Sequence, residues 1–305
     1  MNHLFTRPIG GRASWGDVFC DADAFLPLAR AIYAREGLPP PARLSGLTPG
    51  TNAVFRAGDT VVKIFAPEES GFNGAHDFAV ERAALRFAAE AGVPVGAPVA
   101  FGCVEDAYTF RYILMEWVDA GEAGDVLPTL GAEQKEQFIH ELKGLLRKLN
   151  RQPGRKLFDP IDAKERAINN PRLSVLPETL AADMRARARA ADVSAPVFVH
   201  GDLTGENVLI RPDGGIVVID FADSNIAPAV YEWPPIVFDL LRGERALVRA
   251  FIGDGCMGMF VDRLVTAVAL HDFGAGIVLE DARRHGVPVP GRLSVYASML
   301  VNRWK

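Results

Sequence analysis

The chain has 305 residues, of which 49% are hydrophobic and 23% are charged, and its formal net charge is −5. This length is sufficient for one large or two modest domains with cores of their own. The composition excludes a low-complexity or collagen-like protein. A mildly acidic chain without a run of Lys or Arg is not expected to bind nucleic acid.

The termini and the cysteines predict a cytoplasmic protein. The N-terminal segment MNHLFTRPIGGRASWGD lacks the basic and then apolar pattern of a signal peptide. No stretch approaches the roughly 18 apolar residues of a membrane span. Cys20, Cys103 and Cys256 are odd in number and far apart, which favours free thiols in a reducing compartment. We expect a monomer or a weak dimer without membrane contact.

The first third of the chain alternates between helical and extended patterns. The segment DADAFLPLARAIYAREG predicts a helix that starts at Asp21 and ends at Gly37. Residues 45–65 predict strands separated by turns. DFAVERAALRFAAEAG predicts a second helix with Asp77 as its N-cap and Gly92 as its stop. Two extended segments, 93–102 and 108–118, follow.

The remainder of the chain is predominantly helical. Helical periodicity begins after Leu130, in the segments 133–150 and 177–192, and resumes from Trp233. The segment FVHGDLTGENVLIRPDGGIVVIDFADS, residues 198–224, interrupts these helices with strands. The sequence therefore predicts a strand-rich part, residues 1–118, and a helix-rich part, residues 119–305.

The interrupting segment contains a predicted hairpin. NVLIR and IVVID flank PDGG, and Asp-Gly is a favoured pair for a two-residue loop. If Asp213 and Gly214 form that loop, Asn207 lies opposite Asp220, whereas a longer or bulged loop shifts the pairing by one residue. Opposed residues lie roughly 5 Å apart.

The polar residues of this segment suggest a reaction. An Asn and an Asp that converge form a hard-oxygen site with few protein ligands, which suits Mg²⁺ bound to a polyphosphate. The Asp202 carboxylate, in the preceding loop, could accept a proton from a hydroxyl that attacks the phosphate. We expect His200 to orient this loop by hydrogen bonding.

These residues carry a resemblance to a known family. HGDLTGEN followed by IDFADS resembles the catalytic and metal-binding loops of the aminoglycoside phosphotransferases. The resemblance implies an α+β, bilobal, protein-kinase-like fold. Its N-lobe, residues 1–118, is an antiparallel sheet with one key helix, and its C-lobe, residues 119–305, is larger and helical. It also implies Asp202 as the catalytic base, Asn207 and Asp220 as Mg²⁺ ligands, and ATP or GTP as the phosphate donor.

The N-terminal part contains a candidate ion pair. Lys63 lies in VVKIF among apolar neighbours, and Glu81 shares a helical face with Ala84, Leu85 and Ala88. A carboxylate on an apolar stripe requires a buried cation. We therefore predict that Glu81 pairs with Lys63, which agrees with the Lys–Glu pair that the family implies.

The remaining nucleotide contacts follow from the resemblance. The backbone around Thr51 and Asn52 would cap the phosphates, although the sequence there has no G-x-G-x-x-G pattern. YILMEWV resembles the linker between the lobes. In that linker the backbone from Glu116 to Val118 would meet the adenine edge, and Met115 would lie behind it.

The acceptor is expected to be an antibiotic. Within the family, the sequence is most similar to hygromycin-B 7″-O-kinases in GTNAVF, VVKIF and LHDFGAGI. This predicts an ATP-dependent kinase that confers resistance by phosphorylating a hydroxyl of an aminoglycoside such as hygromycin B. The side chains expected to hold the aminosugar ammonium groups are carboxylates: Asp223, Glu232, Asp239 and Asp272.

Two alternatives remain open. The same chemistry could act on a nucleoside antibiotic of the capuramycin type, or on a metabolite hydroxyl such as that of choline, homoserine or a ketosamine. A neutral, aromatic-rich pocket would favour the nucleoside, and an acidic pocket would favour the aminosugar. A nucleotide-binding module without activity is the alternative of another class, but such proteins usually lose the base or a metal ligand.

Overall fold

The computed structural model describes residues 3–48, 50–154, 156–157 and 162–305. The chain divides into two units, which we call unit 1 and unit 2. Unit 1 comprises the residues up to Glu90, Pro94–Asp119 and the short segment Asp220–Asp223. Unit 2 comprises Ala91–Val93, Ala120–Ile219 and Ser224–Lys305. The segment that carries Asp220 thus belongs to the unit formed by the N-terminal third.

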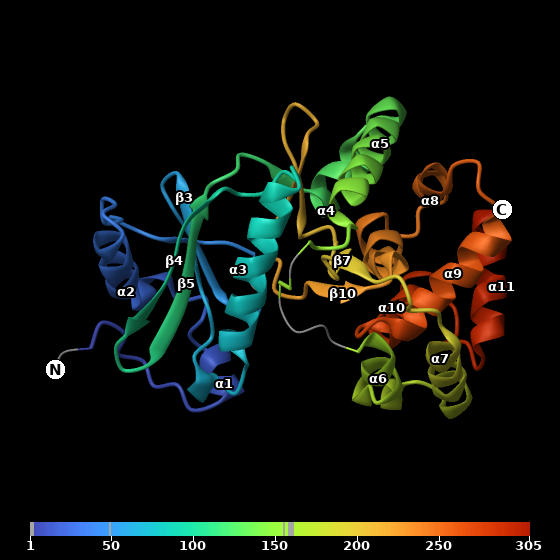
Figure 1. Ribbon diagram of the computed structural model, residues 1–305, viewed down its shortest axis with the longest axis horizontal. Helices are drawn as coiled ribbons and strands as arrows, with labels where there is room; N and C mark the ends of the chain where they lie inside the picture. Colours follow the sequence, from blue (N-terminus) through green and yellow to red (C-terminus); the bar gives the residue numbers. More distant parts are fainter. Residues whose placement is uncertain (1–2, 49, 155, 158–161) are drawn as a thin grey trace. The chain divides into compact units, whose positions relative to one another are not determined.

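Unit 1 is built on a five-stranded antiparallel sheet of order β1-β2-β3-β5-β4. The strands are β1 Ser45–Gly46, β2 Ala53–Ala57, β3 Thr60–Ile64, β4 Pro98–Glu105 and β5 Thr109–Glu116. The helices are α1 Arg12–Gly16, α2 Ala22–Arg35, η1 Glu68–Ser70 and α3 Gly74–Glu90. Figure 1 shows α2 and α3 on opposite sides of this sheet.

The register of the sheet assigns each side chain to a face. Phe55, Val62 and Leu114 lie side by side across three strands, and they belong to the core cluster that contains the buried side chains of α2. Because neighbouring residues of a strand point to opposite faces, Lys63 and its partner Ile113 point away from α2. Lys63 therefore lies on the face that α3 covers.

The two helices begin where their first turns are capped. Asp21 caps α2, and its carboxylate accepts a hydrogen bond from the Ala24 N–H at 3.1 Å. The prediction for α3 was wrong, since this helix starts at Gly74, and the Asn73 carbonyl accepts its first hydrogen bonds. Asp77 thus lies in the first turn instead of capping it.

Unit 2 is predominantly helical, with two small sheets of order β6-β8-β9 and β10-β7. Its strands are β6 Gly121–Glu122, β7 Val197–Val199, β8 Val208–Ile210, β9 Ile216–Val218 and β10 Asn225–Ala227. Its α-helices are α4 Ala123–Val126, α5 Ala132–Leu149, α6 Ala163–Ile168, α7 Glu178–Ala190, α8 Arg245–Ile252, α9 Met257–Leu270, α10 Gly274–Arg284 and α11 Leu293–Trp304. Its other helical turns are η2 Leu127–Thr129, η3 Pro171–Val175, η4 Ala229–Glu232 and η5 Pro235–Leu240.

These elements confirm the predicted α+β class, with the strands concentrated in unit 1 and the helices in unit 2. In unit 2, a buried cluster joins β7, η4 and the end of α9, and it includes Val199, Tyr231 and Leu270. Val199, a member of this cluster, is the last residue of β7 and directly precedes the loop that begins at His200. Among the described residues, no helix combines the length and the apolar character that crossing a membrane requires.

Candidate active site

The loop after β7 holds Asp202 and Asn207 against each other. The side-chain nitrogen of Asn207 donates to the Asp202 carboxylate at 2.8 Å and to the Asp202 carbonyl at 2.9 Å. Because both partners are acceptors, the NH₂ group of the amide must face Asp202. The amide oxygen of Asn207 is thereby turned away from Asp202, in an orientation that allows it to bind a cation. Asp202 itself is half-buried.

His200 connects this loop to the β9 strand. Its side chain is fully buried, its Nδ1 accepts the Asp202 N–H at 3.2 Å, and its Nε2 lies 3.0 Å from the Ile219 carbonyl. Since Nδ1 is an acceptor, the proton of the neutral ring must be on Nε2, which donates to Ile219. This arrangement makes His200 an orienting group for Asp202, as expected from the sequence.

Glu232, in η4, binds the backbone of the same loop. Its side chain is fully buried, and its two carboxylate oxygens accept the backbone N–H groups of His200 and Gly201. The Asn150 amide donates to the same carboxylate at 3.3 Å. Burial raises the pKa of Glu232 to about 7, while these three donors act in the opposite direction.

His271, directly after α9, holds the loop from a third side. Its Nδ1 accepts the Phe273 N–H at 3.2 Å, and its Nε2 donates to the Gly201 carbonyl at 3.0 Å. The ring is buried and stacks on Tyr231 with 4.4 Å between ring centres. Burial lowers the pKa of His271 to about 4. Gly201, which precedes Asp202, is therefore held at both its N–H and its carbonyl.

The hairpin after this loop forms, but the predicted register was wrong by one residue. Val208 pairs with Val218 and Ile210 with Ile216, so that Asn207 faces Ile219, whose N–H donates to the Asn207 carbonyl at 3.0 Å. The loop contains three residues instead of two, and Gly214 adopts a left-handed conformation with φ of 85°. This is the three-residue loop with a bulge, the alternative that shifts the pairing.

In unit 1, the predicted Lys63–Glu81 pair is confirmed and has a third member. The Lys63 ammonium lies 2.8 Å from the Glu81 carboxylate and 2.7 Å from the Asp220 carboxylate. Lys63 and Glu81 are almost fully buried, whereas 41% of the Asp220 side chain is exposed. Burial alone would lower the pKa of Lys63, but the two carboxylates outweigh it and raise that pKa, so the ammonium stays charged.

The conformation around Asp220 is unusual for a residue with a side chain. Asp220 has φ of 57°, in the left-handed region that few residues other than glycine adopt. The following Phe221 is fully buried in unit 1, and the Phe221 backbone donates to Glu81. Burial raises the pKa of Glu81, whereas Lys63 opposes this shift. The strained backbone thus places the Asp220 carboxylate on Lys63 while Phe221 packs in the core.

The residues expected to contact the nucleotide lie in unit 1. Asn52 is buried, and its side-chain oxygen accepts the Ala66 N–H at 3.1 Å, so its side chain stabilises the loop itself. Thr51 is exposed, and its carbonyl accepts the Trp15 indole N–H at 2.8 Å. These contacts hold the backbone of the segment in place.

The predicted linker segment follows β5. Met115 is half-buried, Glu116 is exposed and Val118 is half-buried. The Glu116 N–H donates to Ala97 and the Trp117 N–H donates to Asp59, both at 2.9 Å. These two donors are thereby occupied within the protein. A nucleobase would have to use carbonyl groups of this segment or the Val118 N–H.

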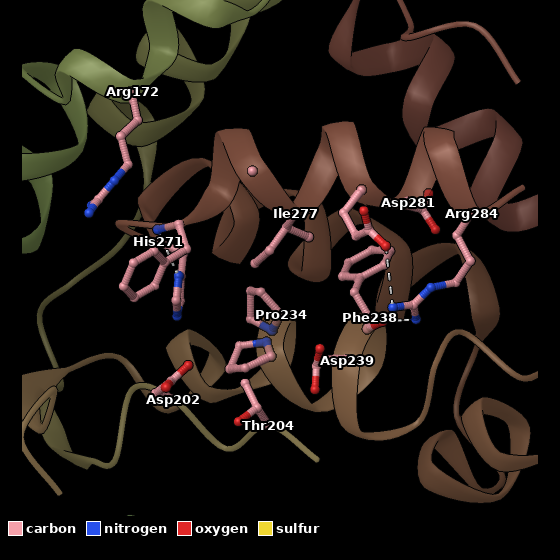
Figure 2. A pocket seen from close by; sticks show the side chains of 14 residues that line it. Arg172, Asp202, Thr204, Pro234, Phe238, Asp239, His271, Ile277, Asp281 and Arg284 are labelled. Carbon is pink, nitrogen blue, oxygen red and sulfur yellow. Dashed lines mark hydrogen bonds and ion pairs between the residues drawn. The ribbon is translucent and has the colours of Figure 1, made fainter. Parts of the chain in front are cut away.

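A cavity of about 360 Å³ opens beside Asp202, entirely within unit 2. Figure 2 shows Asp202 and Thr204 from the loop on one wall and Ile277 from α10 on the facing wall, with Pro234 between them. Its lining combines apolar and charged side chains: Arg172, Asp202, Thr204, Pro234, Pro235, Phe238, Asp239, His271, Phe273, Gly276, Ile277, Glu280, Asp281 and Arg284.

Of the four carboxylates expected to bind the acceptor, only Asp239 lines the cavity. Its carboxylate accepts the Gly205 N–H at 2.8 Å. Glu232 cannot contact an acceptor, because it is fully buried and binds the loop backbone. Asp272 is not part of the lining and forms an ion pair with Arg166. Asp223 is exposed in unit 1.

A divalent ion would find few protein ligands here. In the part of the chain that the structure describes, no three His, Cys, Asp or Glu side chains gather in a metal-binding arrangement. The oriented oxygen of Asn207, in unit 2, and the partly exposed carboxylate of Asp220, in unit 1, are each hard oxygen ligands. Oxygen ligands of this kind are the ones that Mg²⁺ accepts, together with water and phosphate.

Sequence reasoning assigned the wrong role to Glu232 and missed two further residues of this region, His271 and Arg172. The role of Glu232 had a signal, since a carboxylate within the apolar run AVYEWPPIV requires a buried partner, as Glu81 does. His271 had a weaker signal, as a polar residue at the end of an apolar helix. Arg172 had none, because only the packing of η3 against α10 brings it to the cavity.

Comparison with known proteins agrees with this geometry. Residues 48–252, more than half of the chain, match the profile of the phosphotransferase enzyme family known as APH. No curated protein matches significantly. Among solved structures, the GDP complex of aminoglycoside 2′-phosphotransferase-IIIa matches with a TM-score of 0.61 and 16% identity, over 89% of this chain and 95% of the other.

Two further structures show that these matches do not single out one acceptor. A choline/ethanolamine kinase family protein from Mesorhizobium loti matches with a TM-score of 0.52 and 19% identity, over 86% of both chains. A thermostable mutant of APH(4)-Ia with ADP and hygromycin B matches with a TM-score of 0.56 and 15% identity, over 90% of this chain and 98% of the other. At these identities the likeness shows the fold alone.

Proposed function

Because the chain belongs to the APH phosphotransferase enzyme family, we propose that it is an ATP-dependent O-phosphotransferase acting on a small-molecule hydroxyl, with Asp202 as the base. The observation that carries this proposal is the restraint on Asp202. Asn207 holds its carboxylate and its carbonyl, His200 holds its N–H, and Glu232 and His271 hold the preceding residue. A group held this firmly suits a reaction in which positioning is most of the catalysis.

The proposed reaction moves one phosphoryl group. The acceptor oxygen bonds to the γ-phosphorus, the bond between that phosphorus and the β–γ bridging oxygen breaks, and the hydroxyl proton passes to Asp202. Lys63, kept charged by Glu81 and Asp220, would stabilise the negative charge of the donor phosphates. A bound Mg²⁺ would neutralise phosphate charge, and Asn207 and Asp220 are its proposed ligands.

Chain connectivity supports that pair of ligands. Although the hairpin register does not oppose the two residues, the Ile219 N–H is bonded to Asn207, and Asp220 is the next residue of the chain. ATP and GTP both remain candidate donors, since the discrimination would depend on backbone groups of Glu116–Val118. Thr51 and Asn52 remain the proposed phosphate-capping segment, and Met115 the proposed contact behind the base.

Two classes of acceptor are proposed. An aminoglycoside such as hygromycin B, with antibiotic resistance as the outcome, is supported by the carboxylates of Asp202 and Asp239 in the cavity. A nucleoside antibiotic or a small metabolite is supported by the apolar wall formed by Pro234, Phe238 and Ile277. We further propose a cytoplasmic enzyme that needs no nucleic acid or membrane partner and is a monomer or weak dimer.

The function is tested by ATP consumption in the presence of Mg²⁺, with and without a panel of aminoglycosides, nucleoside antibiotics and hydroxylated metabolites. We expect phosphorylated product from at least one acceptor. In the Asp202→Asn variant we expect a rate lower by about 10²- to 10⁴-fold with nucleotide binding retained. Undiminished turnover in that variant would refute the role of Asp202, and the absence of any ATP binding would refute the phosphotransferase itself.

A further inference from the structure

Most charged side chains of the cavity already have partners inside unit 2. Asp281 is buried and accepts from Arg303 at 2.6 Å and from the hydroxyl of Tyr296 at 3.1 Å. Glu280 pairs with Arg283 at 2.7 Å, and Arg284 donates to the Phe238 carbonyl, also at 2.7 Å. The far end of the cavity is therefore close to neutral, and it offers little attraction to a polycation.

Arg172 is different. It is exposed in η3, and among the described residues its guanidinium forms no ion pair or side-chain hydrogen bond. Its Cζ lies over the ring of Phe273, at 4.7 Å from the ring centre, in a cation–π contact. Figure 2 shows Arg172 at the end of the cavity where Asp202 lies, with His271 between them.

The surroundings of Arg172 keep its charge uncompensated. The neighbouring Asp272 carboxylate is already bound to Arg166. His271, which faces the same end, is neutral because its Nδ1 is occupied as an acceptor. Burial is the main cause that lowers the pKa of His271, and the positive charges of Arg166 and Arg172 act in the same direction.

We infer, on the premise of the proposed function, that Arg172 binds an anionic group of the acceptor. The acceptor class is then a small hydroxylated molecule that carries a carboxylate or a phosphate, with its hydroxyl directed to Asp202. A guanidinium fork fits both anions, since two parallel N–H groups can meet two oxygens. The cavity volume of about 360 Å³ lies near the lower end of the range for small-molecule sites. Of the two acceptor classes proposed above, this inference favours the small metabolite over the polycationic aminoglycoside.

The test uses pairs of acceptors that differ only in the anionic group. The pairs are L-homoserine and 3-amino-1-propanol, the ketosamines made from glycine and from methylamine, and glycerol 3-phosphate and glycerol; hygromycin B, kanamycin and choline are added as cations. Acceptor-dependent ATP consumption is measured for the full chain, for Arg172→Gln and Arg172→Lys, and for Arg249→Gln. Arg249 is an exposed arginine of α8 outside the cavity and serves as the matched control.

We expect the anionic member of at least one pair to be the better substrate. In Arg172→Gln its KM should rise about 10- to 100-fold, the loss expected for a charge-assisted hydrogen bond. The KM for ATP and the melting temperature should not change. Arg172→Lys should retain part of the affinity, and Arg249→Gln should match the wild type. The carboxylate and phosphate pairs together identify which anion is bound.

Several results would overturn the inference while leaving the phosphotransferase function in place. One is a preference for the uncharged or cationic member of each pair. Another is turnover of only the cationic acceptors hygromycin B, kanamycin or choline. A third is a KM for the anionic acceptor that does not change in Arg172→Gln. Hydrolysis of ATP without phosphorylation of any anionic acceptor would count against it as well. A complete failure to bind or consume ATP would instead reject the proposed function itself.

Discussion

Removal of the Glu232 carboxylate tests how the loop around Asp202 is held. In Glu232→Ala, the backbone N–H groups of His200 and Gly201 lose their acceptors in a fully buried site. Each buried donor left without a partner costs about 1–3 kcal/mol. We therefore expect unit 2 to be destabilised by about 2–6 kcal/mol at pH 5.

The pH dependence of this effect has a defined sign. The pKa of Glu232 is about 7 in the folded protein, against 4.5 for an ordinary Glu. A carboxyl group whose pKa is raised on folding contributes stability that is complete below the unfolded pKa and is lost as the pH rises through the folded pKa. Each pH unit in that window corresponds to about 1.4 kcal/mol. The difference between wild type and Glu232→Ala should thus shrink by up to about 3 kcal/mol from pH 4.5 to pH 7.

The assay is urea unfolding followed by intrinsic fluorescence at several pH values, with Glu136→Ala as the control. Glu136 is an exposed residue of α5, and its removal should change the unfolding free energy by less than about 0.5 kcal/mol. Phosphotransfer should fall in Glu232→Ala, because the Asp202 loop loses its anchor. A variant as stable as the control at pH 5, or a difference that grows with pH, would refute this reasoning.

Three further predictions concern other parts of the molecule. Burial lowers the pKa of His271 to about 4, so the folded protein should lose about 3 kcal/mol of unfolding free energy as the pH falls from 6.5 to 4. Unfolding measured at several pH values should show a smaller loss in His271→Gln. Lys63→Met should abolish phosphotransfer and lower the unfolding free energy by about 3–5 kcal/mol, because it leaves two carboxylates without their cation; retention of wild-type stability would contradict this. Gly74→Ala should lower the melting temperature, since a Cβ there would lie 2.1 Å from the Ala66 carbonyl oxygen. Gly144→Ala in α5 is the control: a Cβ there has room, and the better helix propensity of Ala should raise the unfolding free energy by about 0.5–1 kcal/mol.

Local patterns in the sequence were sufficient for the long helices α2 and α5 and for the buried ion pair. Helical spacing placed Glu81 on an apolar stripe, and the desolvation cost of an isolated charge required a cation such as Lys63. The structure contains that pair and adds Asp220, which no local pattern of β3 or α3 could indicate. The resemblance of two short motifs was sufficient for the fold class.

The predictions were wrong where the conformation of a single residue sets the strand register, or where a single long-range contact sets the role of a side chain. The bulge at Gly214 shifted the hairpin register, since a two-residue and a three-residue loop are both compatible with the letters PDGG. Glu232 was expected to bind an acceptor because its charge is visible in the sequence and its burial is not.

The sequence by itself indicated the phosphotransferase family, because the proposed base, the proposed metal ligands and the proposed phosphate-binding lysine are marked by residue type and spacing within short segments. Only the tertiary structure decided which charges remain available to an acceptor. Asp281 and Asp272 are neutralised by arginines far away in the chain, Arg303 and Arg166, and Glu280 is neutralised locally by Arg283, while Arg172 keeps its charge at the end of the cavity where Asp202 lies. Electrostatic compensation depends on distance in space, and spacing along the chain does not reveal it.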